Sequence, residues 1–130
     1  MNILDASALL AFIKKEKGGK MINKLLTEKT SVFIHAVNFA EVQYKSEQLL
    51  GHKKTTKILA DLRTPFIGIM HYLDADLMFY AANLKANYHL SLGDAIGLAN
   101  TKIMKGTFWT ADQALKPIAI KEEISIVSIR

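Results

Sequence analysis

Short apolar segments alternate along the chain with longer stretches in which apolar residues recur every three or four positions. The short segments are rich in β-branched and aromatic residues and predict strands at residues 2–4, 31–34, 66–70, 107–110 and 124–129. The longer stretches predict helices at residues 6–15, 20–27, 36–50, 55–63, 74–87 and 91–104. Strands separated by helices favour a parallel sheet with helices on both faces. The pattern therefore predicts an α/β fold, a three-layer α/β/α sandwich around a central, mainly parallel five-stranded sheet.

The chain shows no internal repeat, no linker rich in proline or serine and no break in composition, so residues 1–130 predict one domain. Its longest apolar run, residues 6–13, is far shorter than the ~20 residues needed to cross a bilayer. No basic residue precedes that run, and Lys14 and Lys15 follow it where a signal peptide would need small neutral residues. We therefore expect a cytoplasmic protein that does not enter a membrane.

Residues 52–54 are expected to form a surface turn.

The charge balance points to a polyanionic partner. There are 17 basic and 12 acidic residues, which gives a formal net charge of +5. A positive surface of this kind favours nucleic acid through phosphate contacts and counterion release. The absence of cysteine excludes disulfides, thiolate zinc sites and cysteine nucleophiles, and it fits a reducing compartment.

Two acidic residues follow predicted strands. Asp5 comes directly after the first strand, and Asp112 lies two residues beyond the fourth. In an open parallel sheet, binding sites form beyond the carboxyl ends of the strands, so both side chains are expected at one edge. Both could instead be N-cap residues, because aspartate is favoured where a strand turns into a helix.

Two further acidic residues lie on predicted helices. Glu41 has Val37, Ala40 and Tyr44 at neighbouring helical positions, which predicts that its carboxylate shares an apolar face turned toward the core. A carboxylate there is costly unless something pairs with it, and Lys45 at i+4 is one candidate partner. Asp94 lies in the first turn of a helix opened by Ser91, where a capping box would also place an acid.

The four acids together carry more weight than any one of them alone. Two carboxylates ~4 Å apart repel each other by about 4 kcal/mol at an effective dielectric constant near 20, so a cluster needs a cation. Ligands that are all oxygen select Mg²⁺ or Mn²⁺ over zinc. The four histidines show no spacing typical of a paired ribonuclease dyad. We therefore expect metal-dependent chemistry if these acids meet.

Two other classes of protein fit less well. A phosphoacceptor signalling module also has acids at strand ends, but it requires an aspartate at the end of the third strand, and residues 66–72 contain no acid. A dinucleotide-binding enzyme is disfavoured because no Gly-x-Gly-x-x-Gly sequence follows a predicted strand.

Four segments carry a resemblance to a known family. They are ILDASALL at residues 3–10, VNFAEV at 37–42, LSLGDA at 90–95 and FWTAD at 108–112. In this order and spacing, across nearly the whole chain, the sequence resembles PIN-domain nucleases. In size and layout it is similar to the toxin component of VapBC toxin–antitoxin pairs.

The resemblance implies an endoribonuclease dependent on Mg²⁺ or Mn²⁺, with Asp5, Glu41, Asp94 and Asp112 as an acidic quartet. Asp5 and Asp94 would be the main metal ligands, and the other two would bind directly or through water. Water activated by the metal would attack an RNA phosphodiester in line and leave 5′-phosphate and 3′-hydroxyl ends. A homodimer and inhibition by a small antitoxin, whose tail enters the active groove, are also implied. A catalytically idle PIN-like binding module and a housekeeping nuclease remain alternatives.

The resemblance also assigns supporting residues. Ser7 and Thr110 match small polar positions near the first and last acids, although they could simply cap a helix and lie in a strand. Asn38 matches a frequent neighbour of the helical acid, but it could equally face solvent. By their position near the acids, and not through the resemblance, four basic residues could bind the RNA backbone, although a solvated helix face is the more common explanation for any one lysine: Lys14, Lys15, Lys45 and Lys116.

Overall fold

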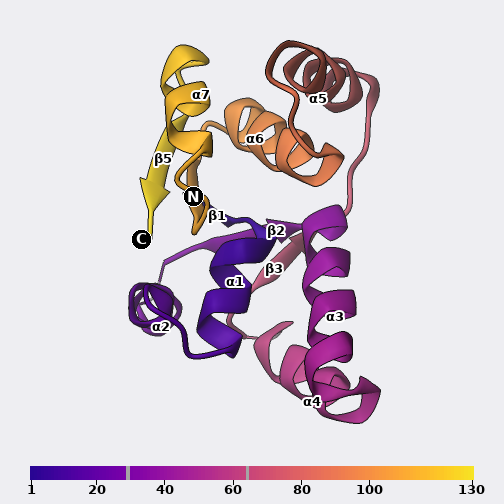
Figure 1. The fold of residues 1–130 in the computed structure, drawn as a ribbon, viewed down its shortest axis with the longest axis vertical. Helices are drawn as coiled ribbons and strands as arrows, with labels where there is room; N and C mark the ends of the chain where they lie inside the picture. The colour runs from indigo at the N-terminus through magenta and orange to yellow at the C-terminus, as the bar shows by residue number, and fades with distance from the viewer. Residues whose placement is uncertain (29, 64) are drawn as a thin grey trace.

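The computed structural model describes residues 1–28, 30–63 and 65–130. Its centre is a five-stranded sheet between two layers of helices (Figure 1). Every pair of neighbouring strands is parallel. The strands are β1 (Asn2–Leu4), β2 (Val32–His35), β3 (Gly68–Met70), β4 (Thr107–Thr110) and β5 (Ser125–Ser128). The predicted three-layer α/β sandwich is confirmed.

The helices divide between the two faces of the sheet, each with its own apolar core. One face is covered by α1 (Ala6–Ile13), α2 (Gly19–Thr27), α3 (Ala36–Leu50) and α4 (His52–Arg63). The other is covered by α5 (Ala75–Tyr88), α6 (Leu92–Met104) and α7 (Leu115–Lys121). Within residues 1–28, 30–63 and 65–130, no helix has the length and apolar character needed to span a membrane.

The order of the strands determines where a site can form. The order across the sheet is β3-β2-β1-β4-β5, so the chain first builds outward from β1 to β3 and then continues on the other side of β1. The connections therefore reverse direction between β1 and β4. In open parallel sheets, the crevice at such a reversal, beyond the carboxyl ends of the strands, is the usual place for a ligand.

Helix α6 lies unusually close to β4. A Cβ atom at Gly97 would be 2.9 Å from the ring of Phe108, which is fully buried. Any larger residue would push the helix away from the sheet or displace the ring. The missing side chain thus allows α6 to pack against β4, and it brings Asp94, one turn earlier, toward the carboxyl edge of the sheet.

Two local predictions are wrong. Residues 52–54 do not form a surface turn but are the first turn of α4, because Gly51, at φ 84°, ends α3 and the chain starts a new helix at once. Helix α7 was not predicted, since its seven residues are too few for a clear periodic stripe. Pro117 stands third in that helix, where no intrahelical bond from its nitrogen is lost.

Candidate active site

The four acidic residues come from four separate segments of the chain and line one cavity of about 350 Å³. Asp5 follows β1 and Asp112 follows β4, so these two flank the point where the sheet connections reverse. Glu41 reaches the cavity from α3 and Asp94 from the first turn of α6. We call this the acidic cavity.

The carboxylate of Asp5 is the most buried of the four, with 2% of the residue exposed. Its Oδ1 accepts hydrogen bonds from the Ser7 hydroxyl at 2.7 Å and the Ala8 amide at 2.8 Å. Its Oδ2 accepts a hydrogen bond from the Thr110 hydroxyl at 2.5 Å. The Ala8 bond caps α1, so the N-cap role considered from the sequence is present. Three donors hold this carboxylate in one orientation.

The two hydroxyls also join the ends of β1 and β4. The Ser7 oxygen accepts a hydrogen bond from the Ala111 amide at 2.9 Å, and the Thr110 oxygen accepts one from the Asp112 amide at 3.0 Å. Ser7 and Thr110 therefore contact both Asp5 and the backbone that carries Asp112. The spacing between these two acids is determined by side chains as well as by the sheet.

Helix α3 presents Glu41 differently from what the sequence predicts. The expected core-facing neighbours were Val37, Ala40 and Tyr44. That prediction is wrong, because all three are exposed, Val37 by 36% and Tyr44 by 50%. Phe39 and Val42 are the apolar residues of α3 that enter the core. Glu41 consequently lies at the rim of the cavity and not against the core.

Glu41 pairs with Lys45 one turn later, with 3.1 Å between Lys45 Nζ and Glu41 Oε2. The i+4 pairing considered from the sequence is therefore present. The hydrogen bond to Glu41 is the main cause that raises the pKa of Lys45, and the charge of Asp94 adds to it. The lysine side chain lines the acidic cavity and compensates part of its negative charge.

Asn38 is buried, which excludes the solvent-facing alternative. Its Nδ2 donates to the carbonyl of Gly93 at 2.9 Å and so ties α3, which carries Glu41, to the segment just before Asp94. Its Oδ1 has no hydrogen-bond partner among the described residues. Asn38 lines the acidic cavity, and its hydrogen bond to Gly93 links the two helices that carry Glu41 and Asp94.

Asp94 and Asp112 differ in whether they take part in capping a helix, as the sequence allowed for both. The Ser91 hydroxyl accepts a hydrogen bond from the Asp94 amide at 3.1 Å and caps α6. Asp112 is not an N-cap, because α7 begins after Ala114 without a side-chain cap. The Asp112 carboxylate accepts instead from the Ala114 amide at 2.9 Å, which forms a local turn.

Burial and like charge make the deprotonated acids costly. Burial raises the pKa of Asp5 to about 6, although hydrogen bonds from Thr110, Ser7 and the Ala8 amide oppose the rise. Burial also raises the pKa of Asp94, and the charges of Asp112 and Glu41 add to it. The repulsion expected from a cluster of carboxylates is therefore present at Asp94.

The donor set of the acidic cavity fits a divalent cation that prefers oxygen. The side chains of four acidic residues line it, and carboxylate oxygens are the ligands that such an ion prefers. In the part of the chain that the structure describes, no three acidic or histidine side chains approach closely enough to hold an ion as they stand. Binding would therefore require the half-buried Glu41 and Asp94 and the exposed Asp112 to move closer together, while Asp5 is already held in place.

The four candidate lysines are spread over four places. Lys45 lines the acidic cavity, and Lys14 lines a neighbouring cavity that shares Ser7, Lys45 and Asp112 with it. Lys116 lies farther along, in a cavity beside α7. Lys15 lines an apolar groove near the end of α1 and does not reach the acids.

One basic residue near the acids was missed by the sequence analysis. Arg130 follows β5 by two residues and lines the same neighbouring cavity as Lys14. The rule that gathers residues after parallel strands at one edge, which located Asp5 and Asp112, applies equally to Arg130.

The raised pKa of Asp5 predicts a pH-dependent stability. Because the folded-state pKa of about 6 exceeds the ordinary 3.8, the folded protein binds this proton more tightly than the unfolded chain does. The resulting stabilisation is present below about pH 4 and is lost as the pH rises through about 6, by about 3 kcal/mol at most. Urea unfolding with EDTA should show that the unfolding free energy of the unsubstituted protein, relative to Asp5→Asn, falls over this range. A constant difference would contradict the buried, strained carboxylate.

The structure is similar to several solved structures across nearly its whole length. One is a toxin–antitoxin complex from Klebsiella pneumoniae, with a TM-score of 0.75, 17% identity and coverage of 100% of this chain and 98% of that chain. Another is VapBC2 from Rickettsia felis bound to a promoter DNA fragment, with a TM-score of 0.76, 16% identity and coverage of 98% and 97%. A third is the sarcin–ricin loop cleaving toxin VapC20 from Mycobacterium tuberculosis, with a TM-score of 0.74, 14% identity and coverage of 91% and 95%. At these identities the likeness shows a shared fold.

The sequence itself identifies the family. No curated protein matches the chain. A family model described as PIN domain matches residues 3–121, which include all four acids and the strands beside them. The resemblance noted in the sequence is thereby confirmed, and the chain belongs to the PIN domain family.

Proposed function

We propose that the protein is a metal-dependent endoribonuclease that hydrolyses RNA phosphodiesters with Mg²⁺ or Mn²⁺, and that it is the toxin of a type II toxin–antitoxin pair. The observation that carries the proposal is the convergence of four acids from distant segments in one cavity, at the reversal point of the sheet. The toxin role is supported by the likeness of the fold to structures of toxins and their complexes. A homodimer, a small antitoxin partner and a cytoplasmic location complete the proposal.

Asp5 and Asp94 are proposed as the main metal ligands, with Glu41 and Asp112 binding directly or through water. A divalent ion in this cavity would supply a nucleophilic water at neutral pH and screen the charge of the phosphate. Ser7 and Thr110 orient Asp5 through their hydrogen bonds, and Asn38 holds the two helices that carry Glu41 and Asp94. These roles need no rearrangement of the buried part of the site.

Lys45 and Lys14 are proposed to hold the RNA backbone near the acids, because both line cavities at this edge of the sheet. Lys116 would contact the strand farther from the cleaved bond. Lys15 has the weakest support of the four, since it lines the groove with Phe12 and Ile13.

Loss of a ligand should abolish cleavage. Asp5→Asn and Asp94→Asn should each lower the rate of RNA cleavage on the order of 100-fold or more, because metal ligands and the groups that orient them control the reaction. Purified protein is incubated with total RNA and Mg²⁺ or Mn²⁺, and cleavage is followed on gels. Asp76→Asn, which changes an exposed acid on α5, serves as the matched control and should keep full activity. Cleavage that survives both ligand substitutions, or that survives EDTA, would overturn the metal mechanism.

Metal binding can be tested without knowledge of the RNA target. Mg²⁺ at roughly 1 to 10 mM should raise the melting temperature by a few degrees, because an ion that binds only the folded state stabilises it and relieves the repulsion at Asp94. Differential scanning calorimetry of the unsubstituted protein and Asp94→Asn should show the rise only in the former. An equal shift in both proteins would mean that the ion binds elsewhere.

Thr110 tests the proposed positioning of Asp5. Thr110→Val keeps the shape of the side chain but removes the hydroxyl, and it should lower cleavage by about 10- to 100-fold. Because the Thr110 hydrogen bond lowers the pKa of Asp5, its loss should also move the acid limb of the pH–rate profile to higher pH. Thr110→Ser retains the hydroxyl and should restore both properties. A reduced rate without a shifted profile would indicate only a packing role.

A further inference from the structure

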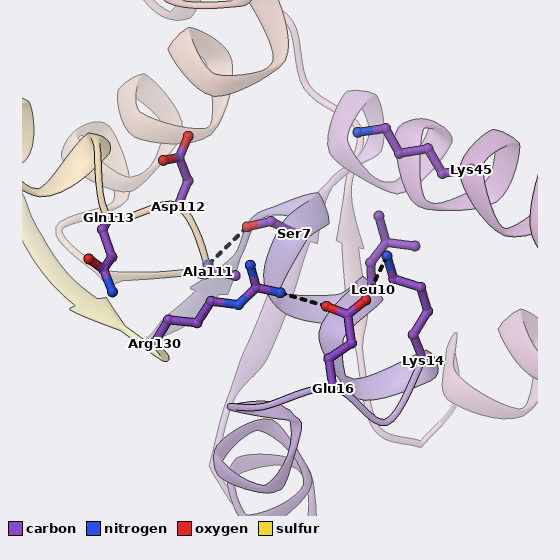
Figure 2. A pocket seen from close by; sticks show the side chains of 9 residues that line it. All are labelled: Ser7, Leu10, Lys14, Glu16, Lys45, Ala111, Asp112, Gln113 and Arg130. Carbon is purple, nitrogen blue, oxygen red and sulfur yellow. Dashed lines mark hydrogen bonds and ion pairs between the residues drawn. The ribbon is translucent and has the colours of Figure 1, made fainter.

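A second cavity of about 350 Å³ adjoins the acidic cavity, and we call it the basic cavity after Lys14, Lys45 and Arg130 (Figure 2). Ser7, Lys45 and Asp112 line both cavities, so the two share a wall. The charge changes sign across that wall. Four acids and one lysine line the acidic side, whereas two acids and three cationic side chains line the other.

Two cations of the basic cavity converge on one carboxylate. Arg130 Nη2 donates to Glu16 Oε2 at 2.5 Å, and Lys14 Nζ lies 2.8 Å from Glu16 Oε1. Figure 2 shows the Glu16 carboxylate between the guanidinium and the ammonium group. The hydrogen bond from Lys14, together with the charges of Lys14 and Arg130, lowers the pKa of Glu16. A compact anion with two oxygens thus already occupies a place between two cations, which is the arrangement that a phosphate group would need.

Most of the hydrogen-bonding capacity of these cations is unused. A guanidinium group has five N–H donors and an ammonium group has three. Among the described residues, Glu16 is the only partner of either charged group. Both side chains are partly exposed, at 43% for Arg130 and 37% for Lys14, so a ligand can reach them from solvent.

We infer that the basic cavity binds a backbone phosphate of the RNA strand next to the phosphate that is cleaved, through Arg130 and Lys14. Glu16 competes with that phosphate for the same two cations. The inference rests on the proposed function and adds to it a site for the flanking nucleotide. It also gives Arg130, the basic residue that follows β5, the role of binding this flanking phosphate.

Continuity of the cavities favours an RNA strand as the ligand. A strand whose cleaved phosphate lies in the acidic cavity must continue across one of its walls, and the basic cavity shares such a wall. Beyond it, Gln113 and Arg130 also line the cavity that contains Lys116. Cationic groups therefore continue away from the acids in one direction, as a repeating polyanion requires.

The test measures binding of a fluorescein-labelled, mixed-sequence single-stranded RNA of about twelve nucleotides, a length within the range that such grooves hold. All proteins carry Asp94→Asn so that the RNA stays intact, and fluorescence anisotropy is recorded in Mg²⁺ at several salt concentrations. Arg130→Gln should raise the Kd by about tenfold, because hydrogen bonds to a charged partner are lost. It should also reduce the slope of log Kd against log salt by about 0.7, the value for one phosphate contact on a single strand.

Two controls separate the site from a general effect of charge. Arg63→Gln removes the same charge from an exposed position at the end of α4 and should change the Kd by less than about twofold. Glu16→Gln frees both cations and should lower the Kd roughly threefold, in line with the strength of exposed ion pairs. Asp61→Asn makes the same charge change beside Lys57, 3.8 Å away on α4, and should leave the Kd nearly unchanged.

The signs of these changes decide the outcome. The phosphate site is overturned if Arg130→Gln binds RNA no more weakly than Arg63→Gln does. It is equally overturned if Glu16→Gln binds RNA no more tightly than Asp61→Asn does. If the unsubstituted protein still cleaves RNA, the proposed function survives that result. If the unsubstituted protein neither cleaves nor binds RNA, the proposed function and the phosphate site both fail.

Discussion

The buried carboxylate of Asp5 is the interaction on which the geometry of the site depends. It is almost inaccessible to solvent, and burial raises its pKa, so the folded chain retains it at a cost. Its three donors come from the first turn of α1 and from the end of β4. Through Ser7 and Thr110 it is also linked to the backbone at Ala111 and Asp112. The start of α1 and the end of β4 are thus fixed relative to one carboxylate, and the other acids are arranged around it.

The charged side chains around Asp5 compensate one another only in part. The deprotonated form of Asp94 is destabilised by burial and by the charges of Asp112 and Glu41, while Lys45 pairs with Glu41 and offsets part of the negative charge at Asp94. Glu16 similarly keeps Lys14 and Arg130 together on the other side of the shared wall. Excess negative charge and excess positive charge therefore lie side by side, and neither is neutralised by the protein. A cation and a polyanion are the two ligands that such a pair of cavities complements.

The sequence predicted the layout of the sheet and most of the site because both follow from simple rules. Residues after parallel strands gather at one edge, and Asp5 and Asp112 are found there. The face of Glu41 could not be predicted, because α3 carries two apolar stripes and periodicity does not indicate which one packs; Phe39 and Val42 do. The missed α7 is too short for periodicity to detect. Arg130 follows the same strand-end rule, but that rule was applied only to acidic residues, and the basic candidates were sought near the acids along the sequence.

Capping and metal binding were treated from the sequence as competing explanations for Asp5, but its geometry allows both. A carboxylate has about four lone-pair sites. Oδ1 uses two of them for Ser7 and the Ala8 amide, and Oδ2 uses one for Thr110. Among the described residues, one lone-pair site of Oδ2 has no donor, and the three hydrogen bonds fix its direction. A cation there would favour the deprotonated form of Asp5 and lower its raised pKa, and it would thereby offset the cost of burying this carboxylate.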